Sequence, residues 1–158
     1  MRRGYSSAGF ARIVAKVREL WPEPVHLSTD ILVGFPGESE AAFLKTLTLV
    51  SELGFGRLHV FPYSRRPGTL AASMESHLPE EIARERCIEA ISVGERLLGQ
   101  YASRFIGDSV SVLVEKARNG ELSGLTPHFL PVRWKGKSAA GQMEKVKVMR
   151  FEKGELLA

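Results

Sequence analysis

The chain has 158 residues, of which 44% are hydrophobic, and this length accommodates one ordinary domain or two small ones. No apolar run approaches the length that spans a membrane, and a single cysteine, Cys87, excludes an internal disulfide and a metal cluster held by this chain's thiolates alone. We therefore expect a soluble, cytoplasmic protein without a secretory signal, in which Cys87 fills a core.

The net charge of +4 comes from the last third of the chain. Residues 1–102 contain 12 Lys and Arg and 12 Asp and Glu, whereas residues 103–158 contain 10 and 6. A basic excess confined to one segment favours a polyanion such as nucleic acid as its partner, although a solvated surface has the same composition.

The first part of the chain alternates helical and strand patterns. Hydrophobic spacing predicts helices over about 7–20, 38–53 and 79–104, with strands over 25–33 and 57–61. Two strands joined by a helix form a right-handed parallel crossover, so the strand ends near Gly34 and Pro62 should lie side by side. Ligands of α/β proteins bind at this edge of the sheet.

The stretch from Thr29 to Glu38 is the strongest local signal for a site. It combines a buried-type strand, a tight loop containing Gly34 and Gly37, and the acidic start of a helix. Such a loop is either a ligand-binding wall or a plain connector. We expect Asp30 to hydrogen-bond loop backbone and His59 to be a core histidine.

After Gly107 the pattern changes to the period of two that is typical of strands. Asn119-Gly120 predicts a hairpin turn, and about five strands follow, as in a small antiparallel barrel of the OB type. The fold class is thus α/β followed by all-β, with domains at 1–102 and 103–158. Two parallel strands with three helices cannot cover both sheet edges, so we expect the chain to be the end of a longer protein.

Three segments, in this order and spacing, resemble the methylthiotransferases of the radical S-adenosylmethionine superfamily: Met1–Tyr5, Asp30–Glu38, and Phe61–Thr69 with Ala71-Ala72. The resemblance covers nearly the whole chain. It implies that residues 1–102 are the C-terminal part of a partial parallel α/β barrel. Residues 103–158, through Val112–Glu115, Gly124–Thr126 and Val132, resemble the RNA-binding TRAM domain of the same family.

Within this family, the segment His59–Ser64 is most similar to the branch that modifies N6-threonylcarbamoyladenosine in tRNA. The isopentenyladenosine branch is the alternative. The resemblance implies S-adenosylmethionine and iron–sulfur clusters as cofactors and tRNA as partner. The family's C-x-x-x-C-x-x-C motif is absent, so we expect the chain to need a missing N-terminal part of the enzyme and to be inactive alone, or to act only as an RNA-binding module.

The resemblance also implies which residues line the S-adenosylmethionine pocket: Arg2, Arg3, Leu32, Val33, Gly34, Phe61 and Tyr63. For RNA, the sequence offers a cationic pair on a loop beside the pocket mouth and a basic, aromatic-containing surface in the last third. The candidates are Arg65, Arg66, Arg118, Phe129, Arg133, Lys135, Lys137, Lys145 and Lys147. Of the two aromatic residues there, Phe129 and Trp134, we expect one to lie in the core.

Overall fold

The computed structural model describes residues 4–21 and 24–158, which form two compact units. Unit 1 comprises residues 27–97 and the described residues of the first 23, and unit 2 comprises residues 24–26 and 98–158. The fold is mixed α/β, as the sequence predicts. None of the described helices is long and apolar enough to cross a membrane.

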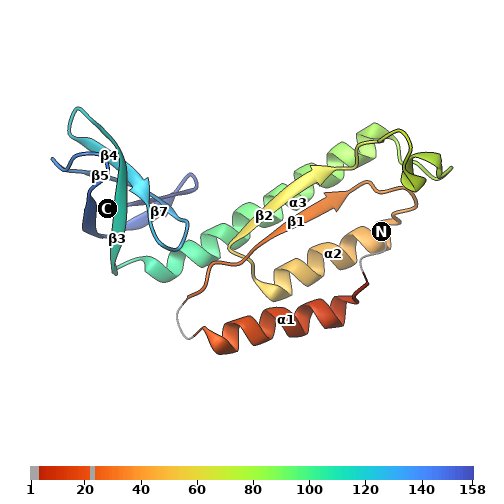
Figure 1. Ribbon diagram of the computed structural model, residues 1–158, viewed down its shortest axis with the longest axis horizontal. Coiled ribbons are helices and arrows are strands. Elements are labelled where there is room, and N and C mark those ends of the chain that lie inside the picture. The colour runs from red at the N-terminus through yellow and green to blue at the C-terminus, as the bar shows by residue number, and fades with distance from the viewer. Residues whose placement is uncertain (1–3, 22–23) are drawn as a thin grey trace. The chain divides into compact units, whose positions relative to one another are not determined.

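Unit 1 has the predicted order of helices and strands (Figure 1). Its elements are α1 (Ser7–Leu20), β1 (Ser28–Val33), α2 (Glu40–Leu53), β2 (Arg57–Pro62), a 3-10 turn (Leu70–Ser73) and most of α3 (Glu80–Ala102). The hydroxyls of Ser6 and Ser39 cap α1 and α2 by accepting hydrogen bonds from the amides of Gly9 and Ala42. Gly54 ends α2 in the left-handed conformation, at φ +60°.

Strands β1 and β2 are parallel, and only one face of their sheet is covered by helices. Ile31 and Val33 are buried on that face, in a core that includes Phe43 of α2 and Ala90 of α3. On the opposite face Asp30 is in register with His59, and both side chains are exposed. The prediction of a core histidine at position 59 is therefore wrong, because its strand register turns it away from the helices.

Unit 2 holds a six-stranded sheet in the order β6-β3-β4-β5-β8-β7. Its strands are β3 (Ser109–Arg118), β4 (Glu121–Leu125), β5 (Pro131–Lys135), β6 (Met143–Lys147), β7 (Arg150–Glu152) and β8 (Glu155–Leu157). All neighbours are antiparallel except β5 and β8. The sequence predicts about five strands, and six are observed. The difference arises because the chain leaves β6 at Val148 and Met149 and then forms the short hairpin β7–β8.

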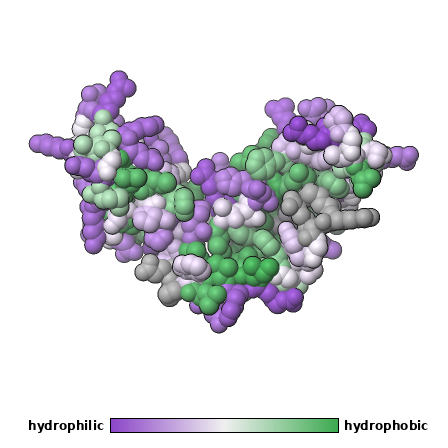
Figure 2. Space-filling view, in the orientation of Figure 1, coloured by the Kyte–Doolittle hydropathy of each residue, from purple (hydrophilic) through white to green (hydrophobic). Residues whose placement is uncertain are grey.

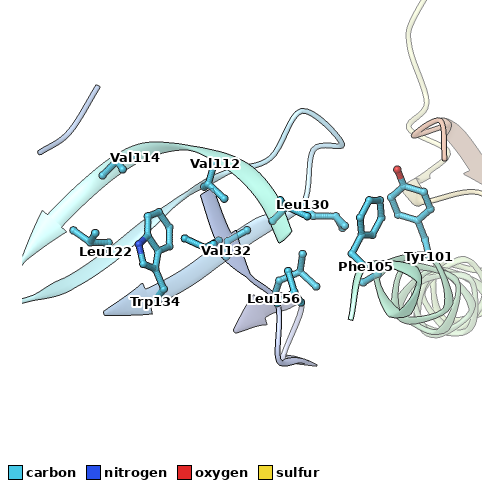
Figure 3. Packing of buried hydrophobic residues seen from close by; sticks show 13 residues of the cluster. Tyr101, Phe105, Val112, Val114, Leu122, Leu130, Val132, Trp134 and Leu156 are labelled. Atoms are coloured by element: carbon cyan, nitrogen blue, oxygen red, sulfur yellow. The ribbon is translucent and has the colours of Figure 1, made fainter. Parts of the chain in front are cut away.

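The core of unit 2 comes from alternate positions of these strands (Figure 3). Val112, Val114, Leu122, Val132 and Leu156 are almost wholly buried, as period-two alternation predicts. Trp134 is also buried, and its Nε1 donates to Glu144 Oε2 at 3.1 Å. Phe129 is 62% exposed, which confirms that one of the two aromatic residues lies in the core.

The buried leucines of unit 2 allow a matched test of this core. Leu130, just before β5, is fully buried, whereas Leu113 of β3 is 43% exposed. Leu130→Ala should lower the free energy of unfolding by about 2–5 kcal/mol, because it leaves a cavity, and Leu113→Ala by about 1 kcal/mol or less. Urea denaturation followed by circular dichroism measures both; equal losses would contradict the burial of Leu130.

Candidate functional site at the carboxyl edge

The carboxyl ends of β1 and β2 meet at one edge of the sheet, as predicted. Val33 is in register with Pro62, and the next amide, that of Tyr63, donates to the Val33 carbonyl at 2.8 Å. The loops that follow the two strands are also joined, because the Gly37 amide donates to the Ser76 carbonyl at 2.8 Å. We call this region, comprising residues 34–38 and 63–77, the carboxyl edge.

Gly34 is the residue that lets β1 leave the sheet at this edge. Its φ is +75°, in the left-handed region that glycine tolerates best. A Cβ at this position would lie 2.8 Å from the Cβ of Ala83 on α3. The tight loop and the close approach of α3 therefore both depend on a missing side chain.

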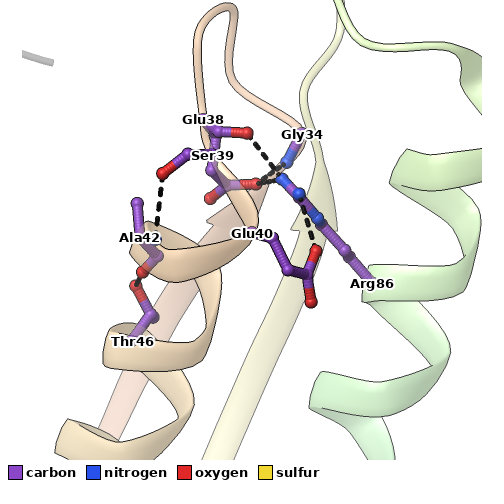
Figure 4. Close-up of polar contacts among 7 residues, drawn as sticks. All are labelled: Gly34, Glu38, Ser39, Glu40, Ala42, Thr46 and Arg86. Atoms are coloured by element: carbon purple, nitrogen blue, oxygen red, sulfur yellow. Dashed lines mark hydrogen bonds and ion pairs between the residues drawn. The ribbon is translucent and has the colours of Figure 1, made fainter.

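A buried ion pair holds the first loop in place (Figure 4). The Oε2 atom of Glu38 accepts hydrogen bonds from the Gly34 amide at 2.8 Å and from Arg86 Nη1 at 2.7 Å. The same Arg86 nitrogen donates to the Glu38 carbonyl at 2.9 Å, and Nη2 donates to Glu40 Oε2 at 3.0 Å. The side chains of Arg86 and Glu38 are only 7% and 13% exposed. Arg86 thus connects α3 to the loop and to the first turn of α2.

The charge of Arg86 is stabilised at this position. Burial by itself lowers the pKa of Arg86, but hydrogen bonds and charges from Glu38 and Glu40 outweigh it and leave the pKa raised. The guanidinium also lies 5.1 Å from the centre of the Phe43 ring, a cation–π distance. Arg86 therefore remains a cation, and the pair is not a switch within physiological pH.

Three amides of this loop are already hydrogen-bonded within the protein. The Gly34 amide is bonded to Glu38, the Gly37 amide to Ser76, and the Glu38 amide to the Phe35 carbonyl at 2.9 Å. Pro36 has no amide hydrogen to donate. These three amides are consequently not free to donate to a phosphate, as the amides of an anion-binding loop would be.

The structure brings together some of the residues that the resemblance assigns to a cofactor pocket. Leu32 and Phe61 are neighbours in register on the open sheet face, and Phe61 is 51% exposed. Gly34 and Tyr63 lie at the carboxyl edge next to them. Val33 has no exposed surface and its side chain packs on the helix-covered face, so it can contribute only backbone to such a pocket. Arg2 and Arg3 lie outside the described residues.

An aromatic cluster at the carboxyl edge adds a residue that the sequence does not single out. The Tyr63 ring contacts Phe35 edge-on, with centroids 5.4 Å apart, and His77 at 5.8 Å. His77 belongs to the segment before α3, and its only sequence signal is that position in a strand-to-helix loop. The expected backbone hydrogen bond of Asp30 is not formed among the described residues.

Some of the candidate RNA-binding side chains are bonded within the protein, and others are exposed. Arg65 Nε and Nη2 both donate to the Ala72 carbonyl, at 2.9 and 2.6 Å. This side chain therefore holds together the two ends of the segment 65–72. Arg66 beside it is exposed. Arg133 pairs with Glu155 at 2.8 Å on the surface. Arg118, Lys135, Lys137, Lys145 and Lys147 are exposed in unit 2.

The two lysines of β6 have the alternation that the sequence predicts. Lys145 and Lys147 are exposed on either side of Val146, which is buried in the core. In register with them on β3 are Ser111 and Ser109, two small and exposed residues. The ammonium groups therefore share one face of an edge strand, without bulky neighbours on β3.

Among the described residues, Cys87 and the acidic side chains form no metal site. Burial raises the pKa of the Cys87 thiol, which packs against the core of unit 1 and fits a core-filling role. Within the ranges 4–21 and 24–158, no group of three or more His, Cys, Asp or Glu side chains could hold a metal ion.

No family model matches the chain. The chain is 39% identical over 151 residues to the tRNA-2-methylthio-N(6)-dimethylallyladenosine synthase of Aliarcobacter butzleri, a match that covers 94% of this chain and 34% of that protein. It is 44% identical over 114 residues to the synthase of the same name from Thermobifida fusca (72% and 23%). It is 34% identical over 156 residues to the threonylcarbamoyladenosine tRNA methylthiotransferase MtaB of Bacillus subtilis (95% and 34%). The chain thus spans about a third or less of the length of the curated relatives it matches.

Breaking the buried ion pair at the carboxyl edge should lower the free energy of unfolding. Arg86→Met should cost about 3–5 kcal/mol of unfolding free energy, because it leaves the Glu38 carboxylate buried without its cation. The double variant with Glu38→Gln should lose less than the sum of the two single losses. Arg84→Met, an exposed position on the same helix, is the control. Urea titration measures the unfolding free energy of each variant. If the losses of the two single variants simply add in the double variant, Arg86 and Glu38 do not interact directly.

Proposed function

Because this chain belongs to the family of tRNA methylthiotransferases, we propose that it is part of an enzyme that adds a methylthio group to an adenine ring next to the anticodon of a tRNA. The observation that carries the proposal is identity of 34–39% to two such proteins over 94–95% of the chain. Residues 1–102 would belong to a radical S-adenosylmethionine barrel, and residues 103–158 would form an RNA-binding TRAM domain. We expect the enzyme to work in the cytoplasm.

The carboxyl edge has features that fit S-adenosylmethionine. Leu32 and Phe61 offer apolar surface on the open face of the sheet, and the Tyr63 hydroxyl stands at the adjoining edge. When bound, S-adenosylmethionine would supply the radical and the methyl group. The part of this chain is to orient the ligand against the sheet. Gly34, held by Glu38 and Arg86, would keep the edge at a fixed distance from α3.

The iron–sulfur clusters implied by the resemblance do not fit the described residues. The chain has one cysteine, and its thiol is packed against the core of unit 1. Clusters would therefore be held by an N-terminal part of the enzyme outside this sequence. If no such part is joined to the chain, it would serve as an RNA-binding module without catalysis.

Two substrate bases are candidates. The segment His59–Ser64 favours N6-threonylcarbamoyladenosine, whereas the names of the relatives from A. butzleri and T. fusca favour N6-dimethylallyladenosine. We propose the first, because the open face of β2 carries His59 and the edge carries Tyr63 and His77, which suit a polar substituent better than an apolar one.

Mass spectrometry of tRNA nucleosides tests this proposal. The complete reading frame that contains this chain should be expressed in a bacterial strain without methylthio-modified tRNA. We expect 2-methylthio-N6-threonylcarbamoyladenosine to appear in the digested tRNA. Appearance of the dimethylallyl product alone would select the second substrate, and absence of any methylthio nucleoside would contradict the enzyme.

Binding of tRNA should depend on salt through the lysines of β6. If Lys145 and Lys147 neutralise two phosphates, replacing both with glutamine should flatten the slope of log affinity against log salt by roughly 1–2 units. The control is the pair Lys16→Gln and Lys45→Gln in unit 1, which should leave the slope unchanged. Titrations at several salt concentrations measure it. A slope unmoved by the unit 2 substitutions would mean that this face is merely solvated.

A further inference from the structure

Two polar atoms at the carboxyl edge are buried without a hydrogen-bond partner. They are the hydroxyl of Tyr63 and Nε2 of His77, and no partner for either is found among residues 4–21 and 24–158. The two rings are neighbours, with centroids 5.8 Å apart and planes inclined by 35°. Buried polar side-chain atoms nearly always have a hydrogen-bond partner, so two unpaired atoms on adjacent rings are an uncommon arrangement.

The backbone holds both residues in position. The Tyr63 amide is bonded to Val33 of β1, and Ser76, next to His77, accepts from Gly37 in the first loop. The Tyr63 ring is packed edge-on against Phe35. Since these contacts are already formed, the two rings are held in place without a ligand, and a ligand that paired with the two atoms would have to reach them where they are now buried.

The chemistry of the two atoms limits what they can bind. A tyrosine hydroxyl donates and accepts, and a histidine nitrogen does one or the other according to its tautomer. Together they suit a carboxylate or a hydroxyl group. A dimethylallyl group would leave both unpaired, and sites built for hydrogen bonding discriminate strongly against groups that cannot make the bond.

We propose that Tyr63 Oη and His77 Nε2 form a binding site for a carboxylate or hydroxyl group of a ligand held at the carboxyl edge. The proposed function supplies the two candidate ligands that could carry this group, so the proposal rests on it to that extent. S-adenosylmethionine carries a carboxylate, and the threonylcarbamoyl substituent carries a carboxylate and a hydroxyl, whereas N6-dimethylallyladenosine carries neither group outside its ribose. The amides of Gly34, Gly37 and Glu38 do not compete for the group, because they are already bonded within the protein.

The test uses the 158-residue chain and the variants Tyr63→Phe and His77→Phe, which keep a ring and remove the polar atom. Tyr5→Phe is the control, because Tyr5 is 60% exposed. Calorimetric titrations with S-adenosylmethionine, N6-threonylcarbamoyladenosine and N6-dimethylallyladenosine give the affinities, and urea denaturation gives the stability of each variant without ligand.

We expect Tyr63→Phe to weaken binding of one polar probe roughly tenfold while the stability of the free chain stays equal or rises. A structural role would have the opposite signature, with stability lost and affinity kept. The polar probe that is weakened identifies the source of the group. Binding of N6-dimethylallyladenosine should be unchanged or tighter.

Three results would overturn the site: unchanged affinity of both polar probes in the two variants, equal weakening of the dimethylallyl probe, or no binding of either polar probe by the unaltered chain. The nucleoside analysis of tRNA described above reports on the enzyme separately. If methylthio nucleosides form while the variants bind normally, the site fails and the function stands. If the variants bind weakly while no methylthio nucleoside forms, the site stands and the proposed function fails.

Discussion

The contact between Arg86 and Glu38 is the constraint on which the carboxyl edge depends. One carboxylate oxygen receives both the Gly34 amide and the guanidinium, so the exit of β1, the start of α2 and the body of α3 meet at one atom. A buried pair of this kind adds little net stability compared with apolar residues, but it penalises every arrangement that leaves one charge unpaired. Its contribution is therefore to fix one loop conformation.

That fixed loop decides how the edge can act. Glycine-rich turns after a strand commonly bind anions through free amides, but the amides of Gly34, Gly37 and Glu38 are bonded within the protein. The proposed recognition uses side chains: the apolar pair Leu32 and Phe61 on the open face of the sheet, and the polar atoms of Tyr63 and His77 at its edge. The proposed site thus combines an apolar wall with a polar end, a pattern common among small-molecule sites.

Much of this could be predicted from the sequence, because it depends on local periodicity. The order of helices and strands, the meeting of the strand ends and the exposure of Lys145 and Lys147 all follow from spacings within one element or one crossover. Contacts between distant residues could not be predicted in this way. Arg86 and Glu38 are 48 positions apart, and nothing near either residue indicates the other.

One wrong prediction, at His59, and two contacts that the sequence does not indicate have the same origin. His59 occupies a strand position that periodicity leaves open to either face, and only its register with Asp30 shows that it is exposed. Arg65 looks like a free cation in the sequence, whereas its guanidinium closes a turn onto Ala72. His77 lies in a loop without a motif, and only its contact with the ring of Tyr63 brings it to the carboxyl edge.

Hydrogen exchange of the Gly34 amide is the most direct measurement of whether the carboxyl edge is held from within. Its partner is a carboxylate that is itself clamped by a buried guanidinium, so the account predicts slow exchange in the unaltered chain. The exposed amide of Gly68 in the second loop is the internal reference. Exchange at Gly34 as fast as at Gly68 would contradict the account, since the loop would then be free to offer its amides to a ligand.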